Sequence, residues 1–160
     1  MWSLKGYLLT RAMFKATIQA TKAALLNREL KATEMVEAIL KEIEHKKYLN
    51  IFLSINKENA LESAKTIDKD IEHNIERVNK LPLLGIPIAH KDLFLTKGLR
   101  TTAASKVLAN YIPPYSATVV DKLAAAGAIV MGKLKTIFTN GSHRDHNWIF
   151  RRSNLCFRGP

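Results

Sequence analysis

The chain has 160 residues, which is enough for one domain or for part of a larger one. Its apolar fraction of 47% allows a globular core, and no apolar run reaches the roughly 18 residues of a membrane span, so we expect no membrane partner. The net charge of +11 favours a polyanion such as RNA, but no basic and aromatic RNA-binding motif is present. A single cysteine excludes an internal disulfide.

The N-terminal part of the chain predicts two consecutive helices. Residues 14–27 have helical spacing, and the apolar face consists of Phe14, Ile18 and Leu25. Thr33 is placed to cap a second helix that ends near residues 45–47, and Glu34 suits the first turn of that helix. The apolar stripe of the second helix consists of Val36, Ile39, Leu40 and Ile43.

A strand and two further helices follow in the pattern. Residues 51–55 alternate as a half-buried strand does, with Ile51, Leu53 and Ile55 on one face. A third helix is predicted from its apolar face, which consists of Ala60, Ala64, Ile67 and Ile71. Residues 101–108 are small and polar at first and then helical in pattern.

An apolar run at residues 83–89 is followed closely by two charged residues, Lys91 and Asp92. The run predicts a strand. Charges at its end are either solvated surface groups or members of a site, because sites are commonly built where a sheet gives way to a loop. The local pattern favours solvated charge and leaves the other interpretation open.

The next part of the chain predicts a helix and a second apolar strand. Residues 117–126 form a short helical pattern that Gly127 stops. Residues 128–131 are a buried-strand run that Gly132 and Lys133 close. Strand, helix and strand in this order indicate a βαβ unit, and therefore an α/β fold with a parallel or mixed sheet.

Beyond residue 133 the composition changes. Arginine replaces lysine as the main positive residue, and no helical or strand period is present. The side chains of His143, His146 and Cys156 could be drawn as a metal site, but three candidate ligands without an acidic cluster are a weak signal. We therefore predict an unstructured tail and no metal site.

Five motifs in the middle of the chain resemble the amidase signature family. The resemblance is closest to its branch of A subunits of glutamyl-tRNA(Gln)/aspartyl-tRNA(Asn) amidotransferases. The motifs are GIPIAHKD at 85–92, TKGLRTT at 96–102, SK at 105–106, PYSATVV at 114–120 and AAGAIVMGK at 125–133. Their order and spacing also match, and the resemblance covers roughly residues 13–133. It implies the N-terminal portion of the amidase signature fold, truncated, with helices packed on a mixed sheet.

The resemblance assigns a catalytic role to Lys91. In this family a lysine at that position is the general base of a Ser–cis-Ser–Lys triad. A lysine after an apolar strand can be desolvated, which makes a neutral amine available to deprotonate a serine. The Gly/Ser-rich stretch that carries both serines in the family is missing here, and Ser142 does not match the nucleophile position. We therefore expect this chain to be inactive alone.

The implied function is that of the glutaminase subunit, which releases ammonia from glutamine. The ammonia serves to convert Glu-tRNA(Gln) to Gln-tRNA(Gln) or Asp-tRNA(Asn) to Asn-tRNA(Asn). Its partners would be the B and C subunits of the amidotransferase, and misacylated tRNA would be reached through the complex. ATP and Mg would be used by the partner subunit, with no cofactor in this chain. The expected location is the bacterial cytoplasm or an organelle. The alternatives are another hydrolase of this family and a non-catalytic remnant that binds a partner.

We expect three segments along the chain. Residues 1–12 are an extension or lie upstream of the true start, and residues 13–133 are the N-terminal part of an amidase domain. Residues 134–160 are a divergent tail, for which a shifted reading frame is one hypothesis, motivated by the composition change. Resequencing of the gene would decide, because an intact frame without downstream amidase coding contradicts a shift.

The remaining conspicuous residues receive structural interpretations. Asp92 is expected to orient the loop or Lys91. For His90 a structural role is favoured, and the alternative is a hydrogen bond near the site. Lys97 and Arg100 are expected to be solvated, and Tyr115 to pack beside the neighbouring prolines.

Overall fold

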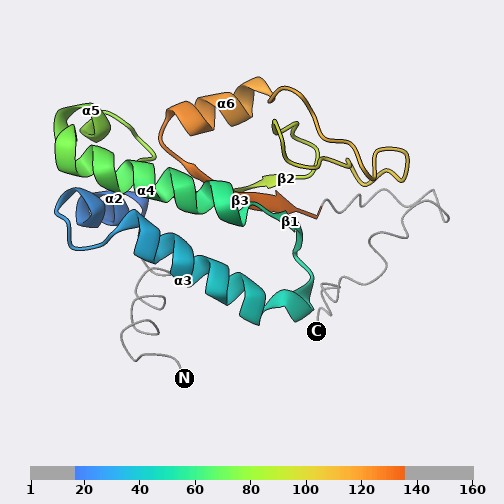
Figure 1. Cartoon of the computed structure of the whole chain (residues 1–160), viewed down its shortest axis with the longest axis horizontal. Helices are drawn as coiled ribbons and strands as arrows, with labels where there is room; N and C mark the ends of the chain where they lie inside the picture. The colour runs from blue at the N-terminus through green and yellow to red at the C-terminus, as the bar shows by residue number, and fades with distance from the viewer. Residues whose placement is uncertain (1–16, 136–160) are drawn as a thin grey trace, which may run out of the picture.

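The computed structural model of the chain describes residues 17–135 (Figure 1). The helices are α2 (Ile18–Leu26), α3 (Ala32–His45), α4 (Lys57–His73), α5 (Ile75–Asn79) and α6 (Thr118–Ala125), with a 3₁₀ turn η1 (Lys47–Leu49). The strands are β1 (Phe52–Ile55), β2 (Pro87–Lys91) and β3 (Ile129–Leu134). The expectations for residues 1–12, for the tail and for its candidate metal ligands lie outside the described residues.

The three strands form one mixed sheet in the order β1-β3-β2. Strand β1 runs antiparallel to β3, and β2 runs parallel to β3. Helix α6 connects β2 to β3, and in Figure 1 these strands lie between α6 and α3. The predicted βαβ unit and the α/β fold with helices packed on a mixed sheet are confirmed. Within residues 17–135, none of the helices is long and apolar enough to cross a membrane.

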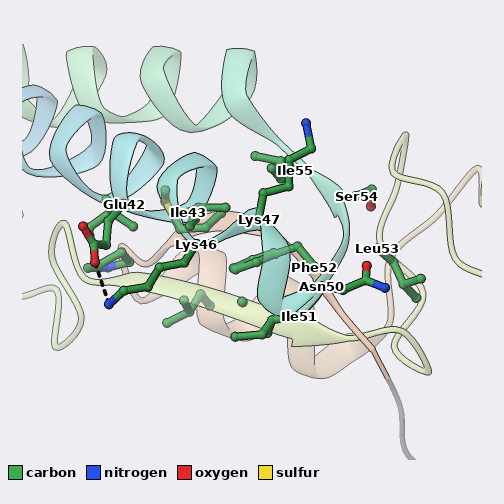
Figure 2. A pocket seen from close by; sticks show the side chains of 15 residues that line it. Glu42, Ile43, Lys46, Lys47, Asn50, Ile51, Phe52, Leu53, Ser54 and Ile55 are labelled. Atoms are coloured by element: carbon green, nitrogen blue, oxygen red, sulfur yellow. Dashed lines mark ion pairs between the residues drawn. The ribbon is translucent and has the colours of Figure 1, made fainter. Parts of the chain in front are cut away.

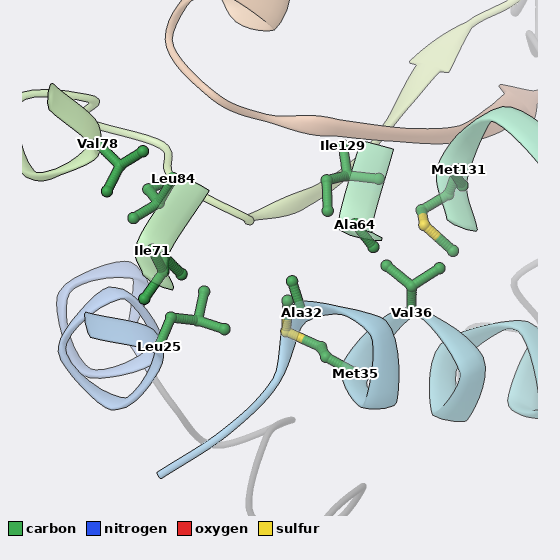
Figure 3. Close-up of a cluster of buried hydrophobic side chains, with 11 residues drawn as sticks. Leu25, Ala32, Met35, Val36, Ala64, Ile71, Val78, Leu84, Ile129 and Met131 are labelled. Atoms are coloured by element: carbon green, nitrogen blue, oxygen red, sulfur yellow. The ribbon is translucent and has the colours of Figure 1, made fainter. Parts of the chain in front are cut away.

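The hydrophobic core forms where α2, α3 and α4 pack against β3 (Figure 3). Its buried members are Leu25, Ala32, Met35, Val36, Ala60, Ala64, Ile71, Val78, Leu84, Ile129 and Met131. The predicted apolar faces of α3 and α4 are confirmed, because every residue named for them is buried or packs against this cluster. Of the face predicted for the first helix, Leu25 is buried in the core, whereas Ile18 is 51% exposed, and Phe14 lies outside the described residues.

The predicted cap of α3 is wrong. The helix begins at Ala32, so Thr33 lies inside its first turn. Asp68 of α4 caps the helix instead, accepting the backbone N–H of Ala32 at 2.7 Å, the N–H of Thr33 at 3.1 Å and the Thr33 hydroxyl at 2.8 Å. A carboxylate brought by tertiary packing thus satisfies donors that a local side chain usually satisfies.

Two strand expectations are also corrected. In β1 it is Phe52 that packs against the core, whereas Ile51 and Ile55 are each 38% exposed. Strand β3 does not end at Gly132 and Lys133 but includes both residues and ends at Leu134. A Cβ on Gly132 would collide with the carbonyl oxygen of Ser54, so glycine lets β1 and β3 approach closely here.

The long connection from β2 to α6 contains no helix, so the helical expectation for residues 101–108 is wrong. Ala103 and Ala104 have φ angles of 48° and 59°, which are left-handed and incompatible with an α-helix. Backbone hydrogen bonds hold the connection in place, including Thr101 N–H to the Tyr111 carbonyl at 3.0 Å and Ala117 N–H to the Leu95 carbonyl at 2.9 Å.

Candidate active site

Buried polar side chains gather at one place in the described part of the chain. They are His90, Asp92, Thr96, Thr101, Thr102 and Lys133. All lie near the C-terminal ends of the parallel strands β2 and β3 or in the loop that follows β2. Ligands and catalytic groups in α/β sheets are commonly placed at this edge, so this cluster marks the candidate site.

Lys91 is the last residue of β2 and pairs with Leu134 of β3. Its carbonyl accepts the N–H of Phe94 at 3.0 Å, which closes a tight turn directly after the strand. The desolvation expected for Lys91 is not found, because its side chain is exposed. The strand therefore fixes the main chain of Lys91 and leaves the side chain exposed, and its role as general base stays a prediction.

Asp92 is completely buried and holds the returning loop. Its carboxylate accepts the N–H of Thr102 at 3.1 Å from each oxygen and also accepts the Thr102 hydroxyl. Its backbone N–H donates to the Leu134 carbonyl at 3.0 Å, and its carbonyl accepts the Ala103 N–H at 3.1 Å. Asp92 therefore fastens the loop to the end of the sheet, as the sequence interpretation expected.

The left-handed pair Ala103 and Ala104 directly follows the residue that Asp92 binds. Such conformations cost of order 1–3 kcal/mol each outside glycine and persist where surrounding contacts impose them. The hydrogen bonds that Asp92 accepts from Thr102 and Ala103 supply that constraint. The strained pair is thus held against Asp92, the residue that follows Lys91.

Lys133 is the residue that sequence reasoning missed. It is completely buried in β3, and its ammonium donates to the Phe94 carbonyl and to the Thr96 hydroxyl oxygen, the latter at 3.1 Å. Burial lowers the pKa of Lys133 below its usual 10.5, and the nearby Asp92 carboxylate partly offsets this effect. The signal was available, because Lys133 follows a buried-strand run just as Lys91 does.

His90 pairs in register with Lys133 and is 5% exposed. Desolvation lowers its pKa below 6.5, and the positive charge of Lys133 lowers it further. Its Nε2 atom is buried without a hydrogen-bond partner among the described residues, so the alternative of a hydrogen bond near the site is not found at that atom. The imidazole is therefore buried at the end of β2, where protonation is disfavoured.

The outer loop residues differ in part from their expectations. Arg100 is exposed, yet its guanidinium donates to the Leu53 carbonyl of β1 at 3.1 Å. Lys97 is exposed as expected. Tyr115 is 58% exposed, so it is not packed down beside the prolines. Among residues 17–135 no group of His, Cys, Asp and Glu side chains could hold a metal ion.

An apolar groove of about 620 Å³ lies between the end of α3, β1 and the start of β2. Figure 2 shows Ile43, Ile51 and Phe52 among its lining side chains, with Lys46 paired to Glu42 at 2.6 Å near one end. Strand β2 contributes residues 87–89 to it, whereas Lys91, Asp92 and Lys133 are not among its lining residues. The groove is thus separate from the polar cluster.

Residues 34–151 match the family model described as Amidase. The chain belongs to the amidase family. It is 43% identical over 121 residues to the A subunit of the glutamyl-tRNA(Gln) amidotransferase of Ralstonia pickettii, covering 76% of this chain and 23% of that protein. The same protein of Dehalococcoides mccartyi is 39% identical over 144 residues, covering 89% and 29%. The chain thus spans about a quarter of the length of these curated relatives.

Solved amidases share the fold of this family member. A Bacillus anthracis amidase family protein superimposes with a TM-score of 0.70 at 28% identity, covering 81% of this chain and 26% of that one. The peptide amidase of Stenotrophomonas maltophilia superimposes with a TM-score of 0.66 at 28% identity, covering 75% of this chain and 24% of the amidase. The resemblance seen in the motifs is confirmed at the level of family and fold.

Proposed function

We propose that this chain is part of the glutaminase subunit of a tRNA-dependent amidotransferase. The similarity to curated A subunits, 43% over 121 residues in one case, carries the proposal. In the complex, ammonia released from glutamine would pass to the B subunit, which would use ATP and Mg to activate the misacylated tRNA. The C subunit would brace the pair.

In this role Lys91 is the general base. As the base, its amine takes a proton through a bridging serine, and this activates the serine nucleophile. The geometry around Lys91 supports the assignment, because its main chain is fixed by β3 on one side and by the Phe94 turn on the other. An exposed amine at the end of a strand is also accessible to groups supplied by a further part of the domain. Backbone N–H groups near the nucleophile would stabilise the oxyanion.

The decisive experiment transplants residues 17–135 into the A subunit of Ralstonia pickettii in place of the matching segment. The rest of that protein supplies the downstream sequence, and the hybrid is assayed for ammonia release from glutamine with and without the B and C subunits. We expect release that depends on the B subunit. Release from glutamine without the B subunit would contradict the proposal.

A stand-alone amidase is the second candidate, favoured by the structural similarity to the peptide amidase. It predicts release of ammonia from peptide amides by the hybrid in the absence of the B subunit. A third candidate is a remnant that binds the partner without catalysis. Capture of the B and C subunits by the 160-residue chain, together with an inactive hybrid, would support this third candidate.

A further inference from the structure

Lys133 is a buried cation without a buried anion in direct contact. In the described part of the chain, ion pairs join Lys46 to Glu42 and Lys47 to Glu44, so Asp92 does not pair with Lys133. Burying an ammonium group is costly unless hydrogen-bond acceptors replace water. The Phe94 carbonyl and the Thr96 hydroxyl oxygen provide that replacement. The lysine therefore directs its hydrogen bonds to the loop that follows β2.

Hydrogen bonds connect Lys133 to Lys91 through the backbone of a single residue, Phe94. The N–H of Phe94 donates to the Lys91 carbonyl at 3.0 Å, and the carbonyl of the same residue accepts from Lys133. Thr96 also donates its hydroxyl to the Phe94 carbonyl at 3.2 Å. Phe94 is thus held by hydrogen bonds at both its N–H and its carbonyl.

We propose that Lys133 is a positioning residue for Lys91. Its ammonium pins the far end of the turn whose near end is the Lys91 carbonyl, and this fixes where β2 stops and in which direction the Lys91 side chain leaves the sheet. An apolar residue at position 133 would pack in the strand but would leave the Phe94 carbonyl without its charged donor. The catalytic meaning of this role rests on the proposed function of Lys91.

The test uses the 160-residue chain and needs no catalysis. In Lys133→Met we expect the amide of Phe94 to exchange with solvent about tenfold faster or more, since a charge-assisted hydrogen bond behind it is lost. The scalar coupling across the hydrogen bond between the Phe94 nitrogen and the Lys91 carbonyl should also weaken in NMR spectra. Amides of α3 and α4 should keep their exchange rates. Unchanged exchange and coupling at Phe94 would overturn the proposal.

Two controls separate positioning from general loss of stability. Lys97→Met makes the same change at an exposed lysine of the same loop and should leave the Phe94 amide unchanged. Thr96→Val removes one acceptor of Lys133 and should speed Phe94 exchange, whereas Thr101→Val, at a buried threonine bonded to the Leu99 carbonyl, should not. The Thr96 variant also keeps the proposal testable if Lys133→Met does not fold.

Chemical rescue gives a readout that a purely structural role would not produce. Lys133→Ala removes the side chain from Cγ outward, and propylammonium matches the deleted part in length and charge. Added propylammonium should restore the coupling between Phe94 and Lys91, whereas tetramethylammonium, which has no N–H donor, should not. Equal effects of the two cations would contradict positioning by hydrogen bonds. Failure of the hybrid glutaminase would affect the proposed function only, because these loop measurements are independent of activity.

Discussion

His90 and Lys133 lie opposite each other in the register of the parallel strands β2 and β3, and both side chains are buried. Two groups that can both be positive are thus packed together at the end of the sheet. Burial lowers the pKa of both, and the charge of Lys133 further disfavours protonation of His90. A second positive charge at this place is therefore disfavoured.

This arrangement predicts acid sensitivity. The pKa of His90 in the folded chain lies below the usual 6.5, so the unfolded chain binds a proton that the folded chain does not. The free energy of unfolding should fall as pH decreases from about 6.5 towards the folded pKa, with a slope of at most about 1.4 kcal/mol per pH unit from this group. Urea unfolding at several pH values measures the slope.

In His90→Leu this contribution to the slope should disappear, since leucine does not titrate. His45→Leu is the matched control, because it makes the same change at an exposed histidine of α3. A slope that persists in His90→Leu would show that another group causes the acid sensitivity.

Removal of the Lys91 amine should abolish turnover. In the hybrid with the Ralstonia pickettii protein, Lys91→Ala should lower kcat for glutamine by about 10²–10⁴, the range typical of a lost general base. Lys97→Ala in the same hybrid, at an exposed lysine after the turn, should retain activity. Steady-state ammonia release measures both, and an active Lys91→Ala hybrid would remove Lys91 from the proposed mechanism.

Loss of the Asp92 charge should loosen the loop. Asp92→Asn weakens the charge-assisted bonds to Thr102, and we expect the free energy of unfolding to fall by about 1–3 kcal/mol. Asp121→Asn, at an exposed carboxylate in α6, should lower the free energy of unfolding by less. Equal costs for the two variants, measured by urea unfolding, would mean that the buried carboxylate contributes no more than a surface one.

The cap supplied by Asp68 should also be measurable. Asp68→Ala leaves the first N–H groups of α3 without an acceptor, and we expect a loss of about 1–2 kcal/mol. Asp70→Ala, two positions along the same helix, removes a carboxylate that does not cap α3. Thermal unfolding of the two variants should separate them, and a similar loss in both would argue against the cap.

Periodic elements could be predicted from the sequence. The faces of α3 and α4 and the βαβ unit follow from the local spacing of apolar residues, because the residues at that spacing are the ones that become buried. The cap at Asp68 could not be predicted, because its partner residues are 35 and 36 positions away in the chain. The loop at residues 101–108 was misread because Asp92 forces left-handed angles on alanines that favour a helix.

The candidate site was predicted only in part. The motif resemblance singled out Lys91, and its local pattern alone favoured solvated charge, which agrees with its exposed side chain. The burial of Lys133 was missed, because a lysine beside Gly132 reads as the end of a strand. The buried run before Lys133 was a signal for a site, but its enclosure depends on the loop that packs over β3.

The enclosure of Lys133 has a chemical consequence. Its amine is sealed within the fold, whereas Lys91, on the adjacent strand, is exposed. Acylating reagents should therefore modify Lys91 readily in the native chain and reach Lys133 only when the chain opens. The ratio of the two modified peptides in a mass spectrum would then report the folded fraction directly, and equal modification of both lysines under native conditions would contradict the enclosure.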